Sequence, residues 1–197
     1  MPAPLRIVIA DDEAVIRMGL RTMLEEQGYR VVGEAGDGAR VVDLVRKLRP
    51  DLVFVDIKMP GMDGLAAAEA LAQREQVPVI VLTAYGDRAL VDRARRSGAM
   101  AYLMKPLRES DLVPAIELAL ARFRDLQAGA ARVAELEAQL ATRKVVERAK
   151  GVLMRRYGLS EEEAYLRLQR ASRNSRRPLR AVAEAVLAGA DPESPGP

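Results

Sequence analysis

The 197-residue chain contains no cysteine, no histidine and no tryptophan, and only 4% of its residues are aromatic. The lack of cysteine excludes a disulfide framework and any metal site built on thiolates. The lack of histidine excludes histidine-dependent triads, imidazole metal ligands and a phosphohistidine formed on this chain. Any chemistry that the chain performs must therefore use carboxylates, hydroxyls and lysine amines.

Long apolar runs are also missing. No stretch approaches the roughly 18 apolar residues that a membrane-spanning helix needs. Acidic residues directly follow the short apolar run near the N-terminus, which argues against a signal peptide. We therefore expect a cytoplasmic protein without a membrane partner. With 49% hydrophobic and 30% charged residues, the chain is predicted to form one or two globular domains.

Charge is divided unevenly along the chain. Residues 1–127 hold 18 basic and 19 acidic residues, a net charge of −1, whereas residues 128–197 hold 13 and 9, a net charge of +4. The stretch 141–180 alone holds 12 basic and 4 acidic residues, or +8. A near-neutral half and a basic half indicate two domains with different partners.

Apolar, β-branched runs alternate with helix-like stretches in the first half. The runs lie at 5–10, 30–35, 52–56, 77–83 and 101–104. The stretches with helical periodicity lie at about 14–26, 38–48, 64–74, 87–97 and 110–124. Five such alternations predict a doubly wound α/β domain with a five-stranded parallel sheet. The first, third and fourth runs read as buried central strands, and the mixed second run as an edge strand.

Polar side chains follow these runs at the points where the predicted strands end. Asp11 and Asp12 follow the first run, Asp56 ends the third, Thr83 the fourth, and Lys105 comes just after the fifth. The carboxyl ends of parallel strands meet at one edge of a sheet, so we expect these five side chains to converge. Carboxylates suit Mg²⁺, which often works with one or two of them and a phosphate. Asp56 is then the candidate nucleophile for an aspartyl phosphate, with Thr83 and Lys105 contacting the phosphoryl oxygens.

Four segments strengthen this interpretation through a family resemblance. "IADDE", "VDIKMPGMDG", "LTAYGD" and "YLMKP" resemble, in order and spacing, the motifs of the receiver domain of two-component response regulators. The resemblance covers about residues 5–125, and we expect a receiver domain at 1–125. It implies a flavodoxin-like fold and phosphorylation of Asp56 by a sensor histidine kinase. It also implies that the protein is not an enzyme, beyond at most slow self-dephosphorylation.

The same resemblance implies a role for individual residues. It implies a Mg²⁺ site whose ligands are Asp12, Asp56 and the backbone carbonyl of Lys58, with Asp11 acting through water. It further implies that Thr83 and Lys105 contact the phosphoryl group. Tyr102 is implied to be the aromatic residue that swings inward. The peptide bond before Pro106 is expected to be cis.

A helical connector is predicted at about 112–145. Leu126, Val133 and Leu140 are spaced by seven residues, and Leu136 fills one intervening position. Two heptads are too few to establish a coiled coil, but this stripe favours pairing with a second copy. We therefore expect a homodimer in the phosphorylated state. Gly129 is a point where the connector could break.

The rest of the chain predicts a small all-α domain of three short helices. Ser160 and Glu163 have the spacing of a capping box before the second of these helices. Pro178 suits the first turn of the third helix, and Gly189 suits its end. The tail at 189–197, rich in proline and glycine, is expected to be disordered.

This basic region carries a second resemblance. The segment "AKGVLMRRYGLSEEEAY", within about 132–188, resembles the core of the ANTAR output domain. That family binds RNA and acts in transcription antitermination, which implies an RNA hairpin in a transcript leader as the ligand. Basic side chains attract phosphates, and RNA bases often stack on aromatic or arginine side chains. The candidate RNA-binding residues are Arg143, Lys144, Arg148, Lys150, Arg155, Arg156, Tyr157, Arg173, Arg176 and Arg177.

Other interpretations stay open at this point. Tyr157 and Tyr165 are either RNA contacts or part of the helical core. The basic domain is either an RNA-binding domain or a phosphorylation-dependent DNA-binding one. A helix-turn-helix needs a polar recognition helix, whereas "NSRRPLRAVAEAVLAG" is mostly apolar at its end, which favours RNA. A phosphatase that uses Asp11 would need cap insertions, and the short loops leave little room for them.

Overall fold

The computed structural model describes residues 3–84 and 97–191. It divides into two compact units, Met1–Gln127 and Ala128–Pro197. Residues 87–96 of the helix predicted at 87–97 lie outside the described residues, as do residues 192–197 of the predicted disordered tail.

A five-stranded parallel sheet forms the centre of the first unit, as predicted. Its strands are β1 (Arg6–Ala10), β2 (Arg30–Ala35), β3 (Leu52–Asp56), β4 (Val79–Ala84) and β5 (Ala101–Lys105). Their order is β2-β1-β3-β4-β5, so the predicted edge strand β2 is indeed at an edge. The central strands β1, β3 and β4 are buried along most of their length. This order places the ends of β1 and β3 side by side.

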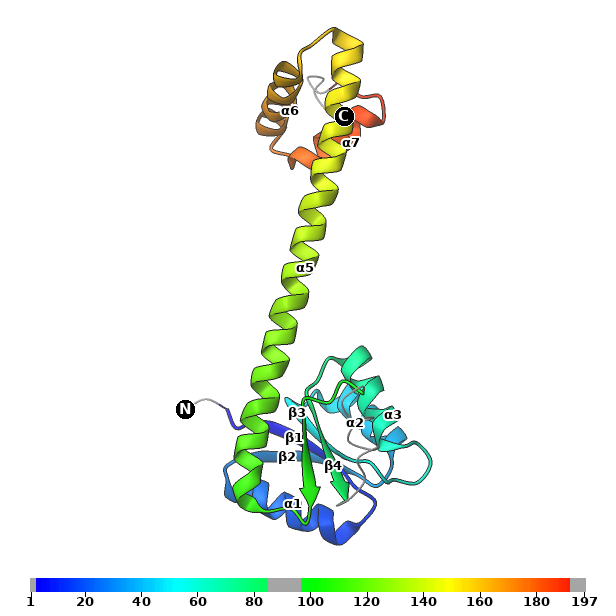
Figure 1. The fold of residues 1–197 in the computed structure, drawn as a ribbon, viewed down its shortest axis with the longest axis vertical. Helices are drawn as coiled ribbons and strands as arrows, with labels where there is room; N and C mark the ends of the chain where they lie inside the picture. Colours follow the sequence, from blue (N-terminus) through cyan, green and yellow to red (C-terminus); the bar gives the residue numbers. More distant parts are fainter. Residues whose placement is uncertain (1–2, 85–96, 192–197) are drawn as a thin grey trace. The chain divides into compact units, whose positions relative to one another are not determined.

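Helices cover both faces of this sheet (Figure 1). They are α1 (Ala14–Glu26), α2 (Gly38–Leu48), α3 (Gly64–Ala70), a π-helical turn at Leu71–Glu75, and the beginning of α5 (Glu109–Tyr157). Successive strand residues point to opposite faces. Ile7 and Ile9 therefore pack with α1 and α5, whereas Val8 and Ala10 pack with α2 and α3. Two separate apolar layers result, and together they fix the strand ends in place.

The helix α5 is longer than the sequence suggested. It runs without interruption from Glu109 to Tyr157. One helix thus takes the place of the predicted helix at 110–124, the connector and the first helix of the C-terminal domain, and Gly129 does not break it. Glycine costs a helix interior only about 1 kcal/mol relative to alanine. The strong helix formers that flank Gly129, mainly alanine, leucine, glutamine and arginine, offset that cost.

The second unit is a small helical bundle. The end of α5 packs with α6 (Glu161–Ser175) and α7 (Leu179–Leu187). The predicted capping box is confirmed, because Ser160 accepts from the Glu163 amide and the Glu163 carboxylate accepts from the Ser160 amide. Pro178 lies just before α7 rather than in its first turn. The core residues of the bundle are Val146, Ala149, Leu153, Ala164, Leu168, Ala171, Val182, Ala183 and Val186.

Among the helices that the structure describes, none combines the length and the apolar character that crossing a membrane requires.

Candidate functional site

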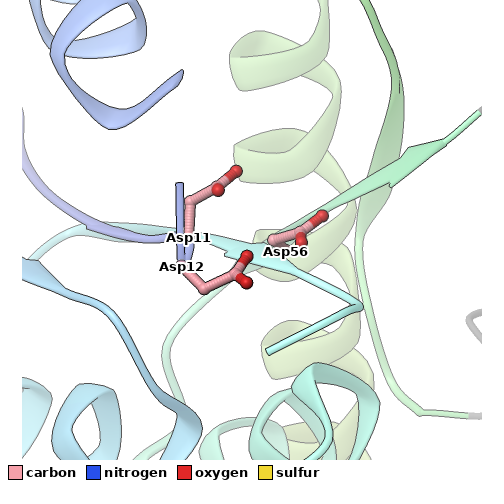
Figure 2. A group of neighbouring side chains, drawn as sticks. All are labelled: Asp11, Asp12 and Asp56. Atoms are coloured by element: carbon pink, nitrogen blue, oxygen red, sulfur yellow. The ribbon is translucent and has the colours of Figure 1, made fainter. Parts of the chain in front are cut away.

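Three carboxylates gather at the carboxyl ends of β1 and β3 (Figure 2). The pairing of Ala10 with Val55 sets these two strand ends next to each other. Asp11 and Asp12 therefore follow β1 at the level of Asp56, the last residue of β3. One oxygen from each carboxylate lies within 4.8 Å of the other two. The convergence predicted from the strand ends is present for these acids.

Lys105 provides the positive charge of the cluster. It ends β5, two strands away from β3, and its long side chain bridges that distance. Its Nζ lies 2.7 Å from Oδ2 of Asp11 and 3.0 Å from Oδ1 of Asp56. Burial lowers the pKa of Lys105, but the hydrogen bonds to Asp11 and Asp56 outweigh that effect, and the pKa is raised overall. The amine is therefore a permanent cation between the two carboxylates.

Asp56 is buried, with 5% of its surface exposed. Burial raises the pKa of Asp56; the hydrogen bond and charge of Lys105 act against this, and the charges of Asp11 and Asp12 add to it. The net increase shows that Lys105 alone does not fully compensate the buried charge. Asp56 therefore sits in a site that favours a further positive charge or a proton.

Asp11 is held more firmly than Asp56. It is fully buried, and its Oδ1 accepts a hydrogen bond of 2.9 Å from the amide of Glu13. The guanidinium of Arg17 donates to the backbone carbonyl of Asp11 at 2.6 Å. These contacts fix the turn that follows β1. The sequence interpretation did not anticipate Arg17, because its contact is to a backbone atom and leaves no motif.

Gly64 is a second residue that the sequence interpretation missed. A Cβ atom at this position would overlap the backbone carbonyl oxygen of Asp56. The Asp63 side chain accepts from the amide of Leu65 and caps α3. The "DG" pair thus lets α3 begin directly against the end of β3. This pair was the sequence feature from which the close contact between α3 and β3 could have been predicted.

The remaining predicted receiver residues, Thr83, Tyr102 and Lys58, differ in how far they are buried. Thr83 is buried at the end of β4, where its hydroxyl donates to the Ala84 carbonyl at 3.3 Å. Tyr102, on β5, is 45% exposed and so faces outward. Lys58 is exposed and lines a hollow together with Asp12. The peptide bond before Pro106 is cis, as predicted.

The donor set fits a hard divalent cation. It offers three carboxylates, whose ligand atoms are all oxygens, beside one lysine amine. Mg²⁺ prefers oxygen ligands and retains several waters. The hollow lined by Asp12, Lys58 and Gly61 leaves one side of the cluster open to solvent. Asp11, Asp12 and Asp56 are the residues that would hold the ion.

In the second unit, Lys150 differs from the other basic candidates. Only 7% of its surface is exposed. Its Nζ lies 2.8 Å from Glu147 and 2.7 Å from Glu161, and these two hydrogen bonds raise the pKa of Lys150. The ion pair to Glu161 joins α5 to the start of α6. This arrangement favours a structural role for Lys150 over a contact with phosphate.

Tyr157 is also engaged within the bundle. Its hydroxyl donates to Asp191 at 2.8 Å. The centroid of its ring lies 4.2 Å from the guanidinium carbon of Arg167 and 5.4 Å from that of Arg156. Arg156 additionally donates to the carbonyl of Gly189 at 3.2 Å. These contacts tie the end of α5 to the segment after α7.

The other basic candidates form an exposed surface. Within residues 3–84 and 97–191, their side chains make no ion pair and no hydrogen bond. They are therefore available to an external anion. These residues are Arg143, Lys144, Arg148, Arg155, Arg173, Arg176 and Arg177.

Because Lys105 does not fully compensate the buried charge of Asp56, we predict an effect of this residue on protein stability. At neutral pH and without divalent cations, Asp56→Asn is expected to raise the free energy of unfolding by about 1 kcal/mol, because it removes a buried charge in a partly screened site. The folded pKa lies above the ordinary value of 3.8. The wild-type protein therefore loses stability as the pH rises from about 3.8 through the folded pKa, and the difference between the two proteins should close at acidic pH.

Urea unfolding followed by circular dichroism measures this difference. Mg²⁺ held by the three carboxylates would stabilise the native state, and this effect should be larger for the wild type than for the variant. If Asp56→Asn is less stable than the wild type at neutral pH without divalent cations, the Asp56 carboxylate is fully compensated by its surroundings, and the prediction is wrong.

Comparison with known protein families matches two models. The response regulator receiver domain matches residues 7–117, and the ANTAR domain matches residues 134–187. The receiver model covers more than half of the chain, including the three carboxylates and Lys105.

Relatives along the whole chain and over the receiver alone agree with these matches. The chain is 52% identical over 184 residues to the transcriptional regulatory protein PdtaR of Mycobacterium tuberculosis, covering 93% of this chain and 90% of that protein. It is 35% identical over 140 residues to the DNA-binding response regulator MtrA of the same species, covering 71% and 61%. Among solved structures, the receiver domain of the putative response regulator NarL from Mycobacterium tuberculosis matches with a TM-score of 0.57 and 35% identity, over 60% of this chain and 98% of that one. The chain belongs to the response regulators, with a receiver domain followed by an ANTAR domain.

Proposed function

We propose that this response regulator is phosphorylated on Asp56 by a sensor histidine kinase and that phosphorylation controls RNA binding by its ANTAR domain. The ligand is an RNA hairpin in a transcript leader, and the outcome is transcription antitermination in the cytoplasm. The cluster of Asp11, Asp12, Asp56 and Lys105 is the observation that carries this proposal. An exposed basic surface on the same chain supports the RNA-binding part.

The chemistry at the receiver is a transfer of one phosphoryl group. An oxygen of the Asp56 carboxylate attacks the phosphorus of the kinase phosphohistidine, a P–O bond forms, the P–N bond breaks, and the imidazole leaves. Mg²⁺, when bound, would offset the negative charge of the transferred group. Lys105 is already within 3.0 Å of Asp56 and is positioned to contact a phosphoryl oxygen. Thr83 would supply a hydroxyl from the neighbouring strand end.

The protein itself has no catalytic role in this proposal. The open hollow beside Asp12 is lined by loop residues of the chain from Ile57 to Asp63. An open surface of this kind suits the docking of a kinase better than the enclosure of a small substrate. The chain therefore receives a phosphoryl group and loses it slowly to water.

DNA binding is the second candidate, and the similarity to a DNA-binding response regulator favours it. A recognition helix must expose one face to the bases. The helix α7 has only nine residues, and Val182, Ala183 and Val186 are buried in the bundle. The geometry of the second unit therefore supports RNA more than insertion of α7 into a major groove.

Phosphorylation provides the first test. Acetyl phosphate is expected to label the wild-type protein only when Mg²⁺ is present, with one phosphoryl group per chain. Asp56→Asn should remain unlabelled, because it lacks the nucleophile. Intact-mass spectrometry measures both results. Labelling of the variant to the wild-type level would rule out Asp56 as the acceptor, and Asp51→Asn, an exposed acid at the start of β3, serves as the matched control.

We further infer that the phosphorylated protein forms a dimer through α5. Leu126, Val133, Leu136 and Leu140 are all exposed on this helix at heptad-like spacing. Sedimentation should show twice the monomer mass for the phosphorylated wild type, and the monomer mass for Leu136→Lys/Leu140→Lys. Ala134→Lys adds a charge on another side of the helix and should still dimerise. An unchanged mass on phosphorylation at micromolar protein concentration would argue against this interface.

The exposed basic surface leads to a prediction about salt dependence. Arg148 and Arg155 lie seven residues apart on α5, close to two turns, and share a face. Each phosphate contact contributes about 0.7–0.9 to the slope of log K against log salt. Arg148→Ala/Arg155→Ala should therefore flatten that slope for hairpin RNA by roughly one to two units.

Lys150→Met is the matched control for this experiment. Because the Lys150 amine already pairs with two carboxylates, its removal should leave the slope unchanged and lower the stability of the bundle. Filter binding at several salt concentrations measures the slopes. Equal slopes for wild type and the double arginine variant would place the RNA surface elsewhere.

A further inference from the structure

A groove on the second unit adjoins the exposed basic surface and shares Arg143 with it. It has a volume of about 650 Å³, within the range of roughly 300–1,000 Å³ typical of ligand sites. It lies where α5, α6 and the start of α7 meet. Its lining includes Gln139, Thr142, Arg143, Val146, Tyr165 and Leu179.

The groove combines an aromatic wall with apolar contacts. The Tyr165 side chain is 38% exposed, so it is not part of the bundle core. Lys150 lies 5.9 Å from the centroid of its ring and stabilises it through a cation–π contact. Val146 and Leu179 add apolar surface. A flat aromatic group can therefore stack here without displacing any core residue.

The charged side chains that line the groove balance one another, with two carboxylates, Glu135 and Glu147, and two cations, Arg143 and Lys150. Glu147 is already paired with Lys150 at 2.8 Å. A lining without net charge suits an uncharged base better than a phosphate. The Glu135 carboxylate already accepts from Gln139, at 3.2 Å. The side-chain carbonyl of Gln139 and the hydroxyl oxygen of Thr142 can accept hydrogen bonds from the edge of a base. Arg143 is exposed at the rim and is available to the adjoining phosphate.

We propose that this groove binds one unstacked nucleobase from the loop of an RNA hairpin, with Tyr165 as the stacking platform and Arg143 holding the neighbouring phosphate. This inference rests on the proposed RNA-binding function and gives it a specific site. Single-stranded loops are where proteins usually read RNA, because their bases can be splayed out and stacked on aromatic side chains.

The test uses the full-length protein and hairpin RNAs with one fixed stem and a randomised loop. The tightest binder is made with 2-aminopurine at each loop position in turn, a base whose fluorescence falls when it stacks. Wild type and Tyr165→Phe should quench the probe at one loop position and bind alike. Tyr165→Ala should lose that quenching and bind roughly 5- to 150-fold more weakly, the range for one base–aromatic stack.

Two further readouts separate stacking from a structural effect. Tyr165→Ala should keep the wild-type salt slope, because no phosphate contact is lost, and circular dichroism should show the wild-type helical content at the temperature of the binding assay. Leu166→Ala, which truncates the neighbouring exposed side chain on α6, should bind RNA like the wild type.

The possible outcomes separate a failure of the groove from a failure of RNA binding itself. If Tyr165→Ala binds the hairpin as tightly as the wild type and quenches the same probe, the groove does not hold a base, although RNA binding stands. If Tyr165→Ala changes the sedimenting mass of the protein and leaves its RNA affinity unchanged, the groove is a protein interface and the inference is overturned. If the wild type binds no hairpin more tightly than duplex DNA of matched length, the proposed function fails, and the inference fails with it.

Discussion

The cost of removing Asp11 and Asp56 from water is the constraint on which the receiver depends. A buried carboxylate is tolerated only with hydrogen bonds or an opposite charge. Asp11 meets this requirement through the Glu13 amide and Lys105. Asp56 meets it only partly, since its pKa is raised by burial despite Lys105. The fold thus leaves a specific deficit of positive charge at the end of β3. That deficit distinguishes Asp56 from Asp11, whose carboxylate has both the Glu13 amide and Lys105 as partners.

The helix α5 links this site to the second unit through the covalent chain. Its first turns pack under the sheet, where Leu112, Ile116 and Ala119 are buried, and its last turns supply Val146, Ala149 and Leu153 to the bundle. Between these two cores the helix has no packing partner within the described part of the chain, and its leucine stripe is exposed. The proposed dimer would bury this exposed apolar stripe against a second copy of α5.

The basic character of the second unit divides into two parts once the contacts are known. Lys150, Tyr157 and Arg156 stabilise the bundle through ion pairs, a hydrogen bond and ring contacts. Arg148 and Arg155 remain exposed and unpaired on α5 among the residues described. Net charge alone does not distinguish the basic residues of these two groups. Only the exposed ones can neutralise a phosphate without first breaking an internal interaction. Tyr165, unlike Tyr157, is exposed beside a groove, which separates two aromatics that look equivalent in the sequence.

Local chemistry determined what could be predicted from the sequence. The alternation of apolar runs and helical stretches predicted the sheet and its buried strands, because periodicity and burial are local properties. The acids at the strand ends followed from the topology of parallel sheets, and the Ser160–Glu163 cap from residue spacing. Only the tertiary structure decided that Gly129 stays helical, that Gly64 must lack a side chain beside Asp56, and that Lys150 is neutralised by Glu161. Gly64 and Lys150 depend on residues that packing brings together in space. The continuity of α5 through Gly129 depends instead on the free energy of the whole helix, which no single residue determines.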